Sequence, residues 1–99
     1  MTKRIKFEKD IKFEAKSSLF CYLKDEKLIF TSYKKYEGPI TLQYLPNGGI
    51  QSLFSGLLIV KVNNGFLSVD HLIYKGEEIS SSSFIKIVGQ DHLLNQILE

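Results

Sequence analysis

The side chains able to act as nucleophile, base or metal ligand are few, and their spacing argues against catalysis. The chain has one cysteine, Cys21, and two histidines, His71 and His92, without the short spacing that zinc sites use. Cys21 falls within an apolar run, where burial keeps a thiol unreactive. Asp70 and His71 are neighbours in an alternating run, so their side chains point to opposite faces and cannot pair. We expect no catalytic residue, no metal site and no cofactor.

The glycine and serine clusters do not indicate a reaction either. Gly48-Gly49 lacks the following Lys-Ser/Thr pair and the helix start of a phosphate-binding loop, and Pro46-Asn47 before it is typical of a tight turn. Residues 80–83 are all serine, without an accompanying base. A serine hydroxyl there is better placed to cap a helix.

Positive charge is concentrated in the first third of the chain. Residues 1–36 carry ten Lys or Arg and five Asp or Glu, whereas residues 37–99 carry three and six. The two parts therefore have net charges of +5 and −3, which together make the overall +2. A basic region of this kind attracts a polyanion such as RNA. The alternative is that lysines interleaved with acids protect strand edges from aggregation.

If RNA binds, its contacts are expected to come from this basic third. Aromatic rings among lysines can stack on bases while the ammonium groups hold phosphates. The predicted nucleic-acid-binding residues are Lys3, Arg4, Lys6, Lys34 and Lys35, with Tyr33 and Tyr36 as stacking candidates. The alternative is that a terminal helix covers the outer face of the strand pair over residues 17–36, with Phe20, Tyr22, Ile29 and Tyr33, which then serve packing.

Two alternating apolar runs, residues 57–62 and 66–74, predict a central β-hairpin. Asn64-Gly65 between them suits a type I′ turn, which needs positive φ at both central residues. That turn places Val62 opposite Leu67. The predicted inner face consists of Leu58, Val60, Val62, Leu67, Val69 and His71. The outer face, with Ile59 and Leu72 among its members, is a mixture of apolar and polar residues.

The N-terminal region predicts two further strand pairs. Ile5-Lys6-Phe7-Glu8 is nearly repeated as Ile11-Lys12-Phe13-Glu14, which favours a hairpin across Lys9-Asp10 or one bent strand. Residues 17–36 predict a second hairpin with Asp25-Glu26 as its loop. Cys21, Leu23, Leu28 and Phe30 then share its core face, and Phe20, Tyr22, Ile29 and Tyr33 share the other.

The rest of the chain predicts one short strand and short helices. Residues 40–44 alternate as a strand does, and a turn follows at residues 46–49. A serine N-cap and Gly89 bracket a helix over residues 84–88, and Asp91 is expected to cap a second over residues 92–98. The expected packing residues are Phe84, Ile87, Leu93, Leu94 and Ile97.

The predicted fold class is mainly β. We expect residues 1–99 to form a single domain, a small OB-like antiparallel β-barrel with one or two short C-terminal helices. The longest apolar run is too short for a membrane span, and the N-terminus has no apolar signal segment. With a lone cysteine as well, the expected location is cytoplasmic.

Residues 49 to 89 resemble the C-terminal domain of the methionyl-tRNA formyltransferase family. The matching elements are Gly49-Ile50, residues 58–62, Asn64-Gly65, residues 67–72, Lys75-Gly76 and residues 83–85, with residues 20–36 similar to the family's preceding strand pair. The resemblance implies an OB-like barrel that has no catalytic role, since the family's catalytic domain is separate and its signature motifs are absent here. In the tRNA enzymes this domain helps to hold the acceptor arm through surface basic residues.

The resemblance implies an accessory or tRNA-binding module of a formyltransferase system, with tRNA or a separate formyltransferase catalytic domain as partner. Glu77-Glu78 stand where the tRNA enzymes often have lysine or arginine, which weakens RNA contact at that edge. The alternative is a protein-interaction or oligomerisation module of a sugar-type or other formyltransferase, docking on a partner or forming a homodimer through the outer face of the central hairpin. Formyl transfer by the chain itself ranks third, and a freestanding protein and an excised domain are both compatible with the sequence.

Overall fold

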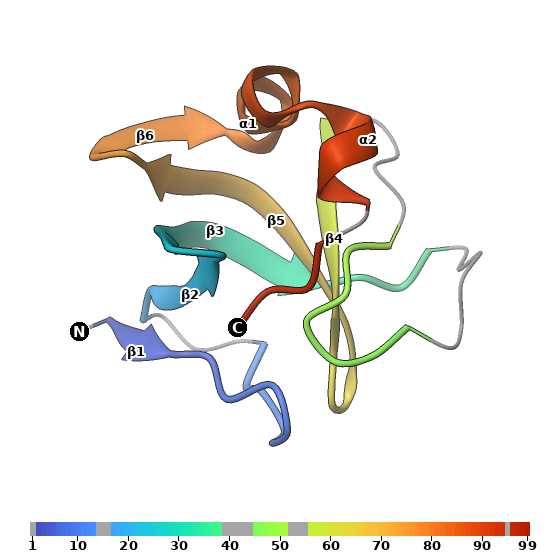
Figure 1. Cartoon of the computed structure of the whole chain (residues 1–99). Coiled ribbons are helices and arrows are strands. Elements are labelled where there is room, and N and C mark those ends of the chain that lie inside the picture. The colour runs from blue at the N-terminus through green and yellow to red at the C-terminus, as the bar shows by residue number, and fades with distance from the viewer. Residues whose placement is uncertain (1, 14–16, 39–44, 52–55, 95) are drawn as a thin grey trace.

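The fold is organised around one long strand, β5 (Gly65–Tyr74), in a computed structural model that describes residues 2–13, 17–38, 45–51, 56–94 and 96–99 (Figure 1). Along one edge β5 pairs antiparallel with β3 (Glu26–Lys35). Along its other edge β4 (Leu58–Val62) pairs with the first half of β5, and β6 (Glu77–Ser80) pairs with the second half. The strand thus connects both halves of the sheet.

The remaining elements extend this sheet and cover one end of it. β2 (Leu19–Leu23) pairs antiparallel with β3, and β1 (Lys3–Arg4) pairs with β2 in parallel. Two short helices, α1 (Ser81–Val88) and α2 (Gln90–Leu93), follow β6, and α1 contacts β4, β5 and β6. The prediction of a mainly β fold with short C-terminal helices is confirmed.

The six strands in the described residues follow an open order, β1-β2-β3-β5-β4 with β6 beside β5, so they do not form a closed barrel by themselves. Short segments outside the strands add a path of backbone hydrogen bonds from β4 to β2. Gly48 N donates to Lys61 O (2.7 Å), Leu98 N donates to Gly48 O (2.8 Å), and Glu99 N donates to Tyr22 O (2.9 Å). The C-terminal residues are therefore part of the sheet structure.

The central hairpin forms with a register two residues away from the expected one. Val62 pairs with Gly65, so the two loop residues are Asn63 and Asn64. Among the described non-glycine residues, only Lys24 and Lys75 have positive φ, so the predicted type I′ turn is wrong. A shift of two keeps each side chain on its face, which explains why the predicted inner face is still correct for its five apolar members.

The second hairpin differs from its prediction in the same way. Cys21 pairs with Leu28 and Leu23 pairs with Glu26, which makes Lys24-Asp25 the loop. The predicted core face is nevertheless confirmed, because Cys21, Leu23, Leu28 and Phe30 are all buried.

An irregularity in the β3–β5 ladder changes which residues of β5 face the core. Phe30 pairs with Leu72 and Tyr33 pairs with Val69, so Thr31 and Asp70 fall where the register shifts. Val69 and Leu72, which both face the core, are therefore three positions apart instead of the two positions of a regular strand, as a β-bulge produces. Leu72 is consequently 0% exposed within the core, and its predicted place on an outer face is wrong.

Three more residues of the predicted outer face are buried as well, while Lys61, Asp70 and Tyr74 are half-buried. Ile59, Phe66 and Ser68 are buried within the chain. The apolar surface on which docking or dimerisation was expected is therefore part of the interior.

The helix-capping prediction is confirmed for α1. The Ser80 hydroxyl accepts a hydrogen bond from Ser83 N (3.2 Å), and Gly89 with φ of 98° ends the helix. Phe84 points into the core, where its ring meets that of Tyr74 edge to face, with centroids 5.1 Å apart.

The last segment is only partly as predicted. Asp91 lies in the first turn of α2 and does not cap it, and the helix ends at Leu93, which is buried. The expected packing role is wrong for three side chains, since Ile87 is 62% exposed, Leu94 41% and Ile97 52%. Ile97 instead lies in an extended segment, where it bridges to Gly49.

The two remaining strand predictions have different outcomes. The near-repeat in residues 5–14 does not form a hairpin over its described part, because β1 pairs with β2 and the following residues are irregular. The predicted strand at residues 40–44 lies outside the described residues. The turn at residues 46–49 is confirmed by a hydrogen bond from Gly49 N to Pro46 O (2.9 Å).

In the described part of the chain, no helix has both the length and the apolar character needed to cross a membrane.

The register irregularity makes a direct prediction about two neighbouring side chains. Leu72→Ala should lower the free energy of unfolding by about 2–5 kcal/mol, because a fully buried leucine is truncated. His71→Ala, the matched control, should change it by no more than about 0.5 kcal/mol, because His71 is exposed. Urea unfolding followed by circular dichroism measures both, and a larger loss for His71→Ala would contradict the observed register.

Candidate anion-binding site

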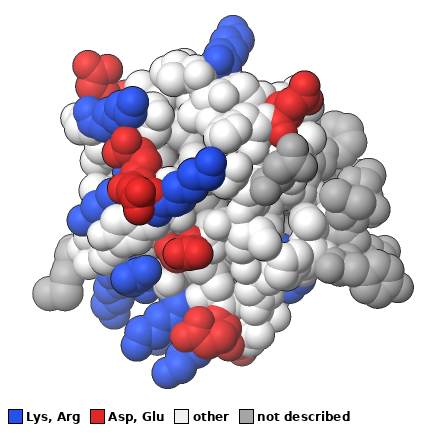
Figure 2. Space-filling view, viewed as in Figure 1, with Lys and Arg blue, Asp and Glu red and all other residues white. Residues whose placement is uncertain are grey.

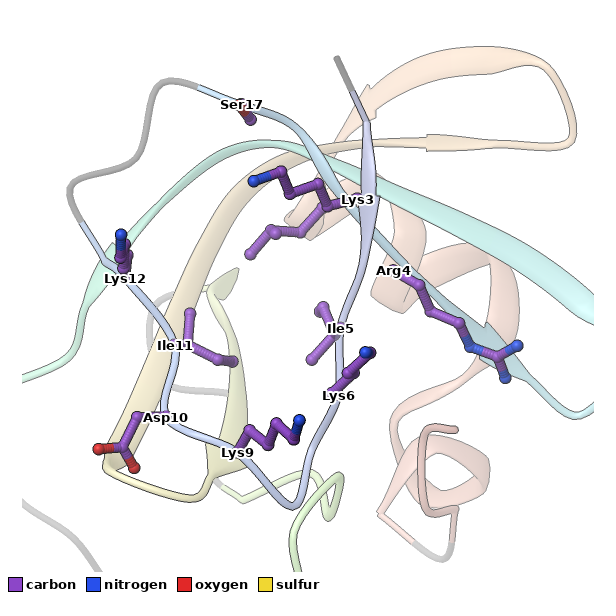
Figure 3. Close-up of a pocket in the computed structure, with 10 residues that line it drawn as sticks. Lys3, Arg4, Ile5, Lys6, Lys9, Asp10, Ile11, Lys12 and Ser17 are labelled. Atoms are coloured by element: carbon purple, nitrogen blue, oxygen red, sulfur yellow. The ribbon is translucent and has the colours of Figure 1, made fainter.

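The N-terminal segment encloses a hollow of about 490 Å³, which we call the N-terminal hollow (Figure 3). The chain runs along β2, reverses direction through a turn in which Lys9 N donates to Lys6 O (2.9 Å), and returns past Ile11. Ile5 and Ile11 point into the space between the two arms, and Leu19 of β2 also lines it. The floor of the hollow is therefore apolar.

The first arm is held by backbone bonds to β2. Lys3 N donates to Ser18 O (3.0 Å), and Ile5 N donates to Phe20 O (2.8 Å). Along this arm Ile5 is buried, whereas Lys3 and Lys6 are exposed. Strand alternation turns Lys6 to the face opposite Ile5, while Lys3 lies on the same face as Ile5, two positions nearer the N-terminus.

The second arm is held by side chains of the β4–β5 turn. Asn64 Oδ1 accepts from Ile11 N and Asn64 Nδ2 donates to Ile11 O, both at 3.0 Å. Asn63 Nδ2 donates to the Asp10 carboxylate at 2.6 Å. A side-chain amide thus satisfies both backbone groups of Ile11, as a neighbouring strand would. These contacts explain why the turn lies at Asn63-Asn64.

The reversal between the arms is held by a third asparagine. Asn47 Nδ2 donates to Phe7 O (2.7 Å), and Asn47 Oδ1 accepts from Lys61 Nζ (3.4 Å). Phe7 itself is buried. The segment around the hollow is therefore attached to the sheet at both arms and at the reversal.

The rim of the hollow is strongly basic. Four exposed lysines that line it form what we call the basic rim: Lys3, Lys6, Lys9 and Lys12. Asp10 is the only acid among the described lining residues, and its carboxylate accepts the bond from Asn63. In the space-filling view, basic side chains gather at the lower left, over β1 and the segment after it, with acidic ones interspersed (Figure 2).

Arg4 also lines the hollow, but its side chain points away from it (Figure 3). Its guanidinium lies over the ring of Tyr22, 5.0 Å from the centroid. On the same face Lys27 Nζ lies 4.5 Å from the centroid of Phe20, and the two rings meet edge to face at 6.1 Å. Cations, rather than the terminal helix considered from the sequence, therefore cover these aromatic rings.

Two predicted residues at the end of β3, Tyr33 and Lys35, contact residues of the N-terminal region. The Tyr33 hydroxyl donates to Ser17 O (2.6 Å), and Ser17 is one of the lining residues. The Tyr33 ring packs against the core, and burial raises the pKa of its phenol above the usual value. Lys35 Nζ lies 5.8 Å from the ring centroid of Phe13, just beyond the second arm.

The other two predicted residues lie close by in the chain. Lys34 is exposed on β3. The backbone N–H of Tyr36 donates to Phe66 O (2.8 Å), and its ring lies against Gly38, where an added Cβ would be 2.5 Å from the phenol oxygen. The structure thus links Tyr33 to the hollow through Ser17, whereas Lys35 lies beside Phe13, which is not among the residues that line it.

Sequence reasoning did not identify Lys9 and Lys12 as binding residues, nor Ile5 and Ile11 as the floor between them. The signal was present in the near-repeat, in which each isoleucine is followed by a lysine. Interpreted as a hairpin or one bent strand, that repeat did not place the two isoleucines on either side of a hollow. Their convergence on one space depends on the three asparagines, which are distant in sequence.

The groups considered for catalysis do not come together. Cys21 is fully buried, and burial raises the pKa of its thiol to about 12, an effect that Arg4 opposes only in part. His71 and His92 are both exposed. No cluster of three His, Cys, Asp or Glu side chains able to hold a metal ion occurs among the described residues.

Comparison with known proteins does not supply a family for this arrangement. No family model matches the chain, and no curated protein matches it. The resemblance to the formyltransferase C-terminal domain therefore stays a prediction.

The raised pKa of Cys21 predicts a protected thiol. In the native protein at pH 8 we expect alkylation by iodoacetamide to be at least about a hundredfold slower than in guanidinium, because the thiolate is the nucleophile. Mass spectrometry of timed samples measures both rates. Comparable rates in the two solutions would contradict a buried thiol.

Proposed function

We propose that this chain is a non-catalytic module that binds the phosphate backbone of RNA, in the first instance tRNA, through the basic rim. The observation that carries the proposal is that four exposed lysines surround one hollow whose only described acid is already bonded to Asn63. Ammonium groups that neutralise phosphates release condensed counterions, which supplies binding free energy.

The positions of the lysines support an extended ligand over a single small anion. Lys3 and Lys6 lie on the first arm, and Lys9 and Lys12 lie at or beyond the reversal (Figure 3). Lys35, beside Phe13, continues the basic surface towards the end of β3. A backbone with repeated charges can contact all of these groups, whereas one phosphate cannot.

The formyltransferase resemblance adds a biological setting to this proposal. A tRNA-binding module would act beside a separate formyltransferase catalytic domain, in the cytoplasm. Glu77 and Glu78, the residues that depart from that family's pattern, lie exposed on β6, and Glu78 accepts a hydrogen bond from Thr31 Oγ1 (2.8 Å). We therefore place the RNA contact at the N-terminal segment and not at β6.

A second candidate function is protein interaction, and one observation favours it. Ile87, Leu94 and Ile97 are exposed in the C-terminal region, which places apolar contacts there rather than on the central hairpin. Exposed apolar side chains that form one contiguous patch favour association with a partner or a second copy of the chain. In this alternative the chain is still a protein-interaction module, but its contact surface is the C-terminal region and not the outer face of the central hairpin.

Removal of two lysines from the rim should weaken tRNA binding and its salt dependence. For Lys9→Gln/Lys12→Gln we expect Kd to rise and the log–log salt slope to fall by about 1 to 2, because two phosphate contacts are lost. The matched control is Lys75→Gln/Lys86→Gln, with the same charge change in the β5–β6 turn and in α1. Fluorescence anisotropy at several salt concentrations measures both, and equal losses in the two variants would contradict a localised site.

Association through the C-terminal region has its own test. If the second candidate is correct, light scattering should show a dimer for the unmodified chain and a monomer for Ile87→Glu, because a carboxylate cannot be buried there without large cost. Lys86→Glu, its exposed neighbour on α1, should remain a dimer. A monomer at all protein concentrations for the unmodified chain removes homodimer formation.

A further inference from the structure

We propose that the N-terminal hollow accepts one unpaired RNA base, with the flanking phosphates held by the basic rim, so that the module selects single-stranded RNA. This inference rests on the proposed function and specifies its ligand. It requires a cavity that fits one base, an apolar surface for that base, and positive charge on both sides of it.

The size and lining of the hollow meet the first two requirements. A volume of about 490 Å³ falls within the range of small-ligand pockets, which is roughly 300–1,000 Å³. Ile5, Ile11 and Leu19 supply aliphatic surface where lysines alone would bind only phosphates. A duplex would make no contact with this apolar floor, because its bases are paired and stacked inside the helix.

The distribution of charge meets the third requirement. Lys3 and Lys6 belong to one arm, while Lys9 lies at the reversal and Lys12 on the other arm (Figure 3). An amphiphile with one anionic head would need charge at one side of the apolar floor only. A nucleotide within a strand carries a phosphate on each side of its base, which matches lysines on both arms.

The two arms of the hollow are also preorganised, because they are held in place before a ligand binds. Backbone bonds to β2 hold the first arm, and the two bonds from Asn64 hold Ile11 in the second. Little conformational entropy then has to be lost when a base enters, which favours affinity. The Asp10 carboxylate accepts a hydrogen bond from Asn63 and points away from the space between the two arms (Figure 3).

The test compares three RNA hairpins with the same fluorescein-labelled stem. One is blunt, one has a three-uridine 3′ overhang, and one has an overhang of three abasic ribose phosphates. The abasic overhang keeps the phosphates and lacks the bases. We expect the uridine overhang to bind at least about fivefold tighter than the abasic one, because the base covers part of the aliphatic floor and removes its apolar surface from water.

Two variants separate the floor from the rim. Ile11→Asn should remove most of the difference between the uridine and abasic overhangs, because it makes the floor polar without adding charge. Its backbone bonds to Asn64 do not require the isoleucine side chain. Lys12→Gln should weaken both overhangs by a similar factor and keep the difference between them.

The outcomes distinguish this inference from the proposed function. Equal affinities of the uridine and abasic overhangs for the unmodified chain overturn the base site and leave backbone binding in place. Failure of all three hairpins to bind at low salt overturns both. If Ile11→Asn does not give a native thermal transition, the comparison on the unmodified chain still decides.

Discussion

Hydrogen bonding between β3 and β5 is the interaction on which the rest of the structure depends. β5 carries β4 and β6 on its other edge, so every strand is attached directly or through β3 to this one pair. The register shift within it turns both Val69 and Leu72 inward, which lets one strand contribute to the core along most of its length. Without that shift, the second half of β5 would present Leu72 to solvent and His71 to the core.

The candidate site depends on a different kind of contact, because asparagine amides take the place of a strand. Asn64 satisfies both backbone groups of Ile11, and Asn47 and Asn63 hold the segment on either side of it. The N-terminal segment can therefore stay irregular and still be fixed in position. This irregularity keeps an open apolar surface between the two arms, where a regular hairpin would have closed it.

Local sequence patterns correctly predicted the features that neighbouring residues determine. They were wrong for features that depend on contacts between residues distant in the sequence. The α1 helix followed from a serine cap and Gly89, and the core faces of two hairpins followed from alternation. The position of the Asn63-Asn64 turn did not, because contacts with the N-terminal segment outweigh the preference of Asn-Gly for positive φ. For the same reason the sequence shows that the N-terminal third is basic, but it does not show that four of its lysines line one hollow.

The hydrogen bonds that join Glu99 to Tyr22 and Leu98 to Gly48 have a consequence for the rate of folding. They connect residues that are far apart in the sequence, as do the bonds between Ile11 and Asn64, which are 53 positions apart. Loop-closure entropy must be lost before such contacts contribute, so a high contact order slows folding. The hairpins can form early from neighbouring residues. We expect the path of bonds from β4 to β2 and the walls of the hollow to be completed last, when the N-terminal segment and the C-terminal residues dock on the sheet.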